Sequence, residues 1–318
     1  MGVVLATVAI VGGLVVLEQS AEHFTTAIGS LARRLRASEG TVGLLTAGGE
    51  WEELVVVVLA VLSGHPGIAV GNVIGACLAN LIGSMPLGML ARQPLRPDRS
   101  ARVYGFVMLA VTVLAAAAFA FDGRVSPAAG SILVAVFAAY VASVLLVIRK
   151  GWLRPPADED DDEPQSDVRL RRLVTVFIVS LILISAAAEA IVLGAAHIAQ
   201  QAGLSEYAIG ATIVAIGTTL PDKAISLLGG IRGQSGVVTS NALGSNIFLL
   251  TLVLGLAALS DPHGVSISQH IARVDLPLLL AASVLVVALF HRASLHRRTG
   301  ITLLALYVSY IAFALVRG

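Results

Sequence analysis

Long apolar runs alternate with short polar segments along the whole chain. The runs have the length of roughly 20 residues that a helix needs to cross the hydrocarbon core of a bilayer. They lack the alternating ten-residue pattern of a membrane β-barrel. The pattern therefore predicts ten spanning helices, at about residues 3–32, 41–63, 68–91, 103–121, 126–148, 172–200, 206–229, 235–258, 274–291 and 299–316.

Composition places these helices in a membrane. The 318 residues are 57% hydrophobic and only 13% charged, whereas roughly a quarter of the residues of a soluble domain are charged. So little polar surface cannot cover a water-soluble body of this size. We therefore expect an all-α integral membrane protein in contact with the lipid bilayer. The formal net charge of +1 argues against a nucleic-acid partner, because such partners attract strongly basic surfaces.

Basic residues separate between alternate loops. Of the 21 Lys and Arg residues, all but four lie in every second loop, beginning with the segment 33–36. The exceptions are Arg124, Arg273, Arg317 and Lys223. Under the positive-inside rule, the basic loops are cytoplasmic. This predicts a multi-pass protein of the cell membrane with both termini outside the cytoplasm.

One acidic, low-complexity segment, PPADEDDDEPQSD at 155–167, divides the chain. Its composition is typical of a solvated linker, and its spacing does not match an EF-hand calcium loop. We predict a first membrane repeat at 1–154, an acidic cytoplasmic linker at 155–171 and a second membrane repeat at 172–318.

The two halves share polar and small residues in the same order. Glu22 and Glu189 are 167 residues apart, and Glu53 and Asp222 are 169 apart. Because each half holds five predicted helices, the second copy enters the membrane from the opposite side. Such inverted repeats are typical of secondary transporters. The other matched pairs are Ala32–Ala199, Ser38–Ser205, Glu39–Glu206, Gly43–Gly210, Gly48–Gly217, Asn72–Asn241 and Gly75–Gly244.

Acidic residues inside the predicted helices point to a function. Each costs about 2.5–3.5 kcal/mol at the bilayer centre on insertion scales, so several together rival the net stability of a domain. We expect them to face a cavity, a partner or a cation, although Glu18 and Glu22 also suit an interfacial position. Adjacent carboxylates repel when ionised, so at least one of a crowded group holds a proton or a cation. The seven acids are Glu18, Glu22, Glu50, Glu52, Glu53, Glu189 and Asp222.

Oxygen ligands surround a proline in the second half, in AIGTTLPDKAIS at 215–226. Pro221 removes a backbone hydrogen bond and kinks the helix. Thr218, Thr219 and Asp222 then offer hard oxygen ligands, which suit Na⁺ or Ca²⁺ better than zinc or copper. The alternative for the two threonines is a hydrogen bond back to their own helical turn. The next predicted helix adds oxygen ligands in SNALGSNIF, at Ser245 and Asn246, beside a small Gly244 that permits close helix packing.

These motifs resemble those of the sodium/calcium exchanger (calcium/cation antiporter) superfamily. GTTLPDKAIS followed by GSNIF is similar to that family's second α-repeat. TAGGEWEEL at 46–54 and GNVIGACLAN at 71–80 occupy the corresponding places in the first half. The resemblance implies ten helices in two inverted five-helix repeats. It also implies a cation antiporter that is not an enzyme, with inorganic cations (Ca²⁺, Na⁺ or H⁺) as substrates and no cofactor.

The resemblance carries over residue by residue. It makes Glu53 and Asp222 the two acidic ligands at the centre of the site. Its further ligand positions are the hydroxyls of Thr218, Thr219 and Ser245, the carbonyl of Ala215 and the late Asn80 of the first half. The chain departs from the family pattern mainly in the first half. There Gly49 and Glu50 replace hydroxyl residues, Glu52 replaces the kinking proline and Ala76 replaces a serine, while Leu249 replaces the final Asp or Asn of the second half.

Three functions are consistent with this sequence. The first is a secondary cation antiporter of the sodium/calcium exchanger type, working by alternating access around a mid-membrane carboxylate site. The second is a proton-coupled exchanger of Ca²⁺ or Na⁺ on the same fold, favoured because Glu50 and Glu52 add titratable groups where neutral ligands are lost. The third is a transport-inactive membrane scaffold, which does not explain why costly acids are kept.

The sequence also makes two geometric predictions. Glu53 and Asp222 occupy equivalent places in an inverted repeat, so they should approach each other near the bilayer centre, with Gly75 and Gly244 packed close by. Lys223 should be partnered by Glu50 or Glu52, because a lone ammonium at this depth is as costly as an acid. The alternative for Lys223 is to extend towards a water-filled cleft.

Overall fold

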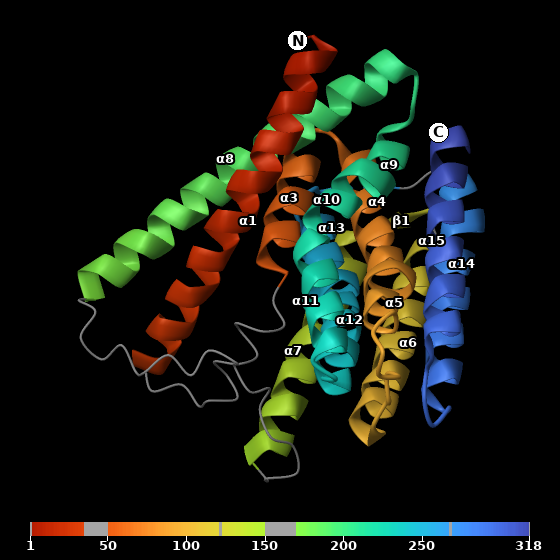
Figure 1. Ribbon diagram of the computed structural model, residues 1–318. Helices are drawn as coiled ribbons and strands as arrows, with labels where there is room; N and C mark the ends of the chain where they lie inside the picture. The colour runs from red at the N-terminus through yellow and green to blue at the C-terminus, as the bar shows by residue number, and fades with distance from the viewer. Residues whose placement is uncertain (1, 35–49, 121–122, 150–169, 267–268, 318) are drawn as a thin grey trace.

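The computed structural model describes residues 2–34, 50–120, 123–149, 170–266 and 269–317. These residues are almost entirely helical (Figure 1). They include eight helices long and apolar enough to cross a membrane, or nine if a bent pair counts as one span. Each of the ten predicted helices coincides with a helical segment, but the one at 41–63 is described only in its second part. The chain is thus a multi-pass helical protein, and the count of ten stays a prediction.

The elements follow one another with short links. The long helices are α1 (Val3–Arg34), α6 (Arg99–Ala120), α7 (Pro127–Arg149), α8 (Leu170–Ala202), α14 (Gln269–Phe290) and α15 (Arg297–Arg317). The shorter helices are α3 (Trp51–Leu62), α4 (Pro66–Leu78), α5 (Met85–Gly88), α9 (Glu206–Ile209), α10 (Ala215–Thr218), α11 (Leu220–Ile231), α12 (Ser235–Phe248) and α13 (Leu254–Leu259). Three π-helical turns, η1 (Ala79–Ser84), η2 (Gly210–Val214) and η3 (Leu249–Val253), and two strands, β1 (Arg124–Val125) and β2 (Val265–Ser266), complete the fold. α8 begins at Leu170, two residues before the predicted end of the acidic linker at 171, and residues 155–169 lie outside the described part.

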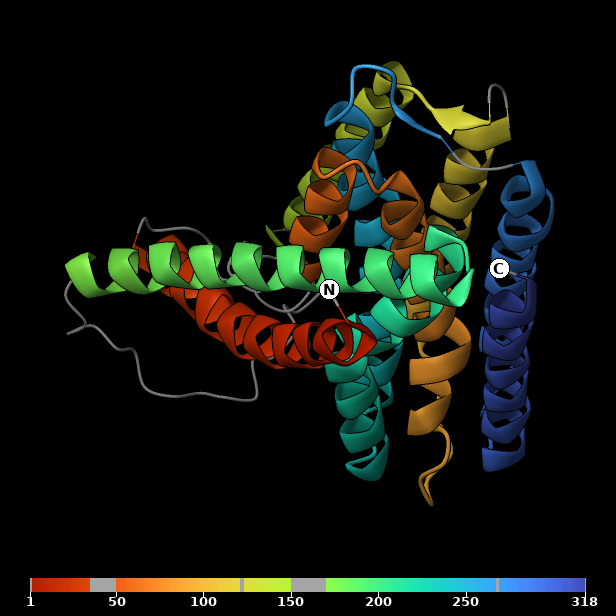
Figure 2. The same cartoon turned by 90° about the horizontal axis from the view of Figure 1, so that it is seen from above.

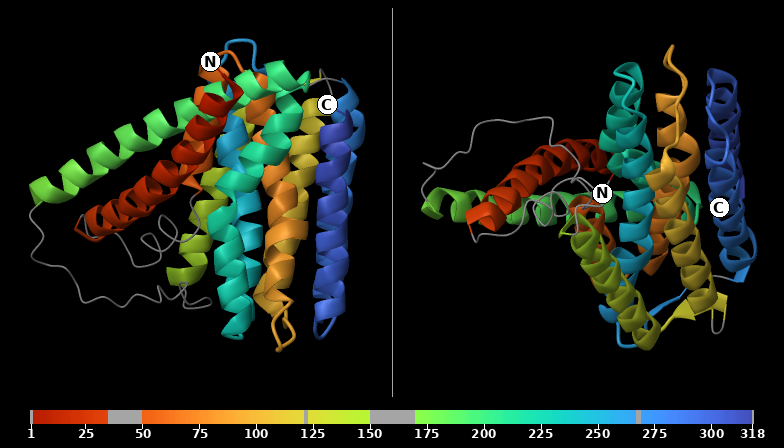
Figure 3. Two further views of the ribbon diagram at one scale, coloured as in Figure 1. Left: turned by 45° about the horizontal axis from the view of Figure 1, so that its top comes forward. Right: turned by 90° about the horizontal axis from the view of Figure 1, so that it is seen from below.

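Two long helices stand apart from an upright bundle. α1 and α8 pack along each other and slant away from the remaining helices (Figure 1), and the view from above shows both extending beyond the bundle (Figure 2). The tilted view shows α11, α12 and α4 within the bundle and α14 and α15 at its edge (Figure 3). The first turn of α1 and the last turn of α15 lie towards the same end of the molecule (Figure 1).

The α4–η1–α5 rod forms the centre of the bundle. The 18-residue apolar window within its span, Pro66–Gly88, is entirely buried, and the corresponding window of the span Ser235–Leu259 is 78% buried. The other spans are at most half buried, so their exposed apolar side chains face outward. A helix that is apolar all round belongs in the protein interior or in lipid. The polar side chains of the α4–η1–α5 rod, Asn72, Asn80 and Ser84, are therefore shielded from the bilayer by protein.

The helix at 206–231 is broken where the sequence predicts. Glu206–Thr218 and Leu220–Ile231 meet at an angle of 49°. Pro221 lies in the first turn of α11, where its missing N–H is tolerated. Thr219 is the joint between the two halves. The predicted kink at Pro221 is confirmed.

Two small bridges join distant loops. Val125 of β1 pairs with Val265 of β2, and Leu95 pairs with Leu295 in an isolated antiparallel bridge. The same difference in residue number connects the two pairings: Val265 follows Leu95 by 170 residues, and Leu295 follows Val125 by 170. The π-helical turns η1 and η3 begin with the same separation. The two pairings are thus the same contact formed twice: the position that the first half supplies to one pairing is supplied by the second half in the other.

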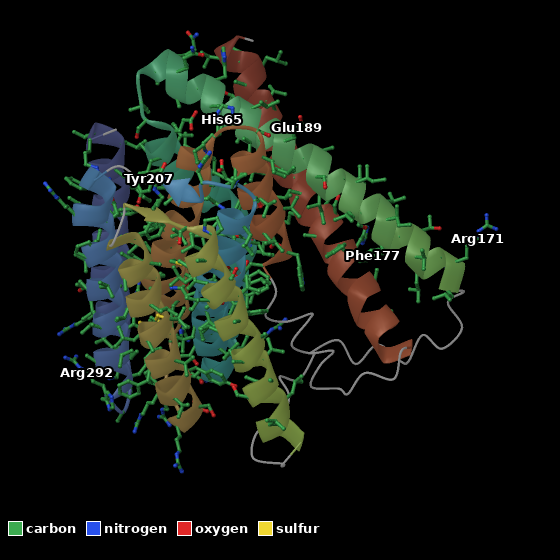
Figure 4. All side chains as sticks on the ribbon, turned by 180° about the vertical axis from the view of Figure 1, so that it is seen from behind. His65, Arg171, Phe177, Glu189, Tyr207 and Arg292 are labelled. Carbon is green, nitrogen blue, oxygen red and sulfur yellow. The ribbon has the colours of Figure 1, made fainter. Side chains whose placement is uncertain are left out.

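Basic loops gather at one end of the bundle. Besides the Leu95–Leu295 bridge, the Arg96 backbone N–H donates to Ser235 Oγ at 3.0 Å, and Arg102 Nε donates to the Phe290 carbonyl at 3.0 Å. These contacts bring together the links before α6, before α12 and after α14. Arg292, in the last of these links, lies at the end opposite the chain termini (Figure 4).

Candidate cation site

Four acidic side chains meet inside the bundle. Glu50, Glu52 and Glu53 each offer a carboxylate oxygen, and these oxygens lie within 4.8 Å of one another. Asp222 of α11 interacts electrostatically with all three. Glu53 is fully buried, and Glu50 and Asp222 are almost so. We call these four residues the carboxylate cluster; so many like charges repel unless a cation or protons offset them.

Helix ends position the cluster. Glu50 directly precedes α3, and Glu52 and Glu53 lie in its first turn. Asp222 lies in the first turn of α11, immediately after the break at Thr219. The N-terminus of a helix carries partial positive charge from its unpaired N–H groups, which stabilises nearby carboxylates. Broken helices that present their ends at mid-membrane build ion sites in many transporters.

Helix α12 supplies the polar neighbours of the cluster. Ser245 Oγ donates a hydrogen bond to Glu50 Oε1, and Asn241 Nδ2 donates to Asp222 Oδ1 at 2.8 Å. The two donors are one helical turn apart, so they share a face. The second oxygen of Asp222 and both oxygens of Glu53 are buried without a hydrogen-bond partner among the described residues. Such oxygens are costly to bury unpaired, and they are the ligands that a hard cation prefers.

The two threonines bond back to their own helix. Thr218 Oγ1 donates to the Val214 carbonyl at 3.2 Å and to Asn72 Oδ1 at 3.4 Å, and Thr219 Oγ1 donates to the Ala215 carbonyl at 2.6 Å. This is the alternative considered from the sequence. A donating hydroxyl keeps its lone pairs for a cation, so both threonines remain candidate ligands. The Ala215 carbonyl also accepts the Thr219 backbone N–H at 3.2 Å, so it is engaged within the helix.

The ammonium of Lys223 is held by the break. Lys223 Nζ donates to the carbonyls of Ile216 at 3.2 Å and Thr219 at 3.3 Å, and to Thr219 Oγ1. These acceptors lie one and two turns earlier on the same bent helix. Pro221 interrupts the regular ladder there, so oxygens of the interrupted turns are accessible to a side chain.

The prediction that Lys223 pairs with Glu50 or Glu52 is wrong. Its hydrogen bonds go to its own helix, and its acidic neighbours are Asp222 and Glu53, with which it interacts electrostatically. The sequence argument did not consider carbonyl and hydroxyl oxygens of the same helix as acceptors for the ammonium group. Three acceptors satisfy the three donors of an ammonium group.

Asn80 lies apart from these contacts. It is fully buried in η1, and neither atom of its amide has a hydrogen-bond partner in the described ranges. Its role as a ligand stays a prediction. Five candidate ligands are connected to one another by hydrogen bonds or electrostatic contacts. They are Glu50, Glu53, Asp222, Ser245 and Thr219, the last through Lys223.

Close helix packing is seen at one of the two predicted glycines. A Cβ on Gly75 would lie 2.4 Å from the Ala211 carbonyl oxygen, so α4 and η2 touch through their backbones. A Cβ on Gly244 would meet nothing within 4 Å. The residue equivalent to Ala211 in the first half, at the 167-residue separation, is Leu44, which is outside the described residues. The packing of Gly244 thus stays a prediction.

Three of the seven acids lie outside the cluster. Glu18, Glu22 and Glu189 are exposed on α1 and α8, and Figure 4 labels Glu189 on α8. Glu18 still interacts electrostatically with Glu52. Four of the seven acids thus gather inside the bundle, while the expectation that each acid faces a cavity, a partner or a cation stays a prediction.

Two asparagines were not among the predicted ligands. Asn241 binds Asp222, and Asn72 accepts the Thr218 hydroxyl. Their matched positions in the two halves were the available signal, because polar amides kept in register inside apolar helices require buried partners. The equivalence is incomplete, since Asn72 Nδ2 and the Glu53 oxygens have no partner among the described residues.

Buried carboxylates in the first turns of helices, inside a bundle of membrane-length helices, are typical of a membrane transporter of cations. The chain belongs to the sodium/calcium exchanger protein family, which matches residues 5–146 and 172–316. It is accordingly a cation antiporter rather than an enzyme. The family assignment confirms the resemblance found in the motifs.

Individual relatives cover nearly the whole chain. A protein of Alkalimonas amylolytica, CaxA, which is proposed to be an antiporter, is 31% identical over 317 residues, covering 96% of this chain and 97% of its own. An uncharacterized membrane protein of Methanocaldococcus jannaschii is 28% identical over 305 residues, 94% of this chain and 95% of its own. A solved structure of the sodium-calcium exchanger NCX_Mj, soaked with Na⁺ and Sr²⁺, has a TM-score of 0.64 and 27% identity, covering 98% of this chain and 99% of that one.

Proposed function

We propose that this protein exchanges Ca²⁺ for Na⁺ across the membrane, by alternating access around the carboxylate cluster. The carrying observation is Glu53, which is fully buried with both oxygens unpartnered among the described residues, beside Glu50 and Asp222. Ca²⁺ takes six to eight oxygen ligands, mostly carboxylate, carbonyl and hydroxyl. The cluster, Ser245 and the hydroxyls of the broken helix offer this set.

The proposed architecture is two inverted five-helix repeats. The repeated bridges Val125–Val265 and Leu95–Leu295 support it, because a pseudo-two-fold axis between the halves produces each inter-half contact twice. The π-helical turns η1 and η3 are likewise equivalent. In such a repeat, Glu53 and Asp222 lie across the axis from each other.

The proposed orientation has the basic loops in the cytoplasm. Arg96 and Arg292 lie in links, and Arg102 lies in the first turn of α6, at one end of the bundle. Both chain ends lie towards the other end (Figure 1). The positive-inside rule then puts both termini outside the cytoplasm and the acidic segment 155–167 inside. An even number of spans is required by this arrangement.

The proposed movement is between the α1–α8 pair and the upright bundle. The pair packs on α3, which carries the acids of the first half. Rocking of one helix group against another around a fixed site is the usual form of alternating access. The pair also touches α10, just before the break in the second half, so its movement exposes the cluster alternately to the two aqueous phases.

Proton coupling is the second candidate. Gly49, Ala76 and Leu249 offer no side-chain ligand at positions where the family supplies one, and Thr219 already holds Lys223. Fewer neutral oxygens leave fewer places for several Na⁺ ions. Carboxyls in contact must share protons or cations, so the cluster is chemically suited to exchange Ca²⁺ for protons.

The test is flux in proteoliposomes with one gradient at a time. Purified protein is reconstituted, and Ca²⁺ uptake is followed with an outward Na⁺ gradient at clamped pH, then with a pH gradient without Na⁺. Uptake with Na⁺ alone supports the proposal, and uptake with the pH gradient alone supports proton coupling. Flux under neither gradient, in vesicles that hold folded protein, indicates the transport-inactive scaffold. Asp222→Asn is the loss-of-site control.

A further inference from the structure

Lys223 carries a positive charge into the cation site. It is half-buried on α11, next to Asp222 in sequence, and its Nζ reaches two carbonyls and one hydroxyl at the break. The charged groups around it are Asp222 and Glu53, both in the carboxylate cluster. The exchange of ions proposed above makes no use of this side chain.

The surroundings of the ammonium match those of a bound monovalent cation. Neutral carbonyl and hydroxyl oxygens form the immediate shell, and carboxylates lie beyond it. Na⁺ is a hard cation that selects the same oxygen atoms. A tethered ammonium satisfies them without a loss of translational freedom, because the chain already holds it there.

We propose that the ammonium of Lys223 occupies one monovalent-cation position of this site permanently, so that the protein binds one Na⁺ fewer than its donor set would otherwise hold. This inference rests on the proposed function in its account of the site as a cation site. Lys223 thereby sets the number of Na⁺ ions exchanged for each Ca²⁺. It also offsets part of the repulsion within the carboxylate cluster when no ion is bound.

A purely structural role for Lys223 predicts something different. A side chain that only caps the broken helix gives a donor to the Ile216 carbonyl and a second donor to the Thr219 carbonyl, which already accepts the Lys223 backbone N–H. Its removal then lowers stability by the same amount in every salt. A resident cation, in contrast, is replaceable by a free one, so the loss depends on which cation is present.

The experiment measures thermal unfolding of purified full-length protein without Ca²⁺. Wild type and Lys223→Ala are compared in NaCl, NH₄Cl and N-methyl-glucamine chloride at equal ionic strength. We expect the variant to lose stability in N-methyl-glucamine and to regain it in Na⁺ or NH₄⁺, with a steeper dependence on Na⁺ than wild type. In proteoliposomes, the Hill coefficient for Na⁺ should rise, by at most one, since the number of coupled sites is the upper limit of that coefficient.

Two further variants keep the test decisive. Lys223→Arg retains the charge and should not gain a Na⁺ response. Lys223→Gln keeps hydrogen-bond donors for the carbonyls but removes the charge, so it replaces Lys223→Ala if that variant does not fold. An identical Na⁺ response in wild type and the neutral variants overturns the inference.

The outcome is separable from that of the proposed function. If wild type moves Ca²⁺ under a Na⁺ gradient but the neutral variants show no new Na⁺ response, the proposed exchange is supported and the proposed role of Lys223 is wrong. If wild type moves no ion while Lys223→Ala gains the Na⁺ response, the proposed role of Lys223 is supported and the proposed exchange is wrong.

Discussion

Ser245 donates a hydrogen bond to the carboxylate of Glu50, although 195 residues separate them in the chain. The bond connects α12 to the start of α3, and so joins the two halves of the protein at the carboxylate cluster. One half supplies the crowded acids and the other supplies the donors. The site is therefore complete only when both halves are packed together.

Removing this donor should destabilise the ion-free protein. Hydrogen bonds to charged groups contribute about 1.5–3 kcal/mol, and an unpaired buried acceptor keeps its full desolvation cost. Ser245→Ala should lower the free energy of unfolding by an amount in this range, measured by denaturation in detergent without divalent cations. The matched control is Ser240→Ala on the same helix, because Ser240 is exposed and bonds only to Val237 of its own turn. Equal effects of the two changes contradict the role of Ser245.

Neutralising the centre of the cluster should have opposite effects on transport and on stability. Glu53→Gln removes one of several buried like charges, so the ion-free protein should become more stable. The same change removes a charged ligand, so Ca²⁺ affinity should fall by at least roughly tenfold, because Ca²⁺ sites are tuned by the charge of their ligands. Uptake in proteoliposomes and thermal unfolding measure the two effects.

The control for this variant is Glu189→Gln. Glu189 is exposed on α8, away from the cluster, and its neutralisation should change neither uptake nor unfolding appreciably. A Glu53→Gln protein with wild-type Ca²⁺ uptake contradicts the placement of the site.

Backbone contact between α4 and η2 requires Gly75. A Cβ at this position would lie 2.4 Å from the oxygen and 2.6 Å from the Cα of Ala211, and neither backbone atom can move aside as a flexible side chain can. Overpacking of this kind costs about 1–3 kcal/mol, so Gly75→Ala should lower the unfolding midpoint clearly. Gly12→Ala is the control, because a Cβ there meets nothing within 4 Å and alanine favours the helix.

The sequence predicted the positions of the helices and the break well. Apolar runs and basic loops are set by the bilayer, which acts on every residue of a span in the same way. The kink followed from Pro221, a local property of one residue. Glu53 and Asp222 were expected to approach each other because they occupy equivalent places in the two halves, and their carboxyl groups do interact electrostatically.

Other features depend on three-dimensional contacts that no pattern contains. Lys223 binds carbonyls of its own helix, since the break makes them accessible, and the sequence shows only side chains. The π-helical turns η1 and η3 have no composition that distinguishes them from the helices around them. The exposure of Glu189 likewise depends on the slant of α8 relative to the bundle.

A buried ion pair near the C-terminus should matter for stability rather than for transport. Arg317 contacts Asp275, which is fully buried, between α15 and α14. Breaking a buried pair by removing one partner costs about 3–5 kcal/mol, because an uncompensated charge stays in the interior. Arg317→Met should therefore unfold at a markedly lower temperature, whereas Arg298→Met, at an exposed position of the same helix, should not. If both variants unfold at the same temperature as wild type, the pair is not a stabilising contact.

Glu50 provides the test of how protons act on the site. Its carboxyl lies beside those of Glu53 and Asp222, and acids held this close must take up protons or a cation together. Lowering the pH therefore sets protons against Ca²⁺ for the same oxygens, and Ca²⁺ uptake by wild type should decrease as the pH falls. Glu50→Gln removes one of the competing carboxyls, so its decrease should be shallower, while Glu189→Gln should follow wild type. The measurement is initial Ca²⁺ uptake over a series of equal internal and external pH values, with the Na⁺ gradient held constant. Superimposable pH profiles for wild type and Glu50→Gln would show that Glu50 takes no part in proton binding, and the proton-coupled candidate would then lose the residue that favours it.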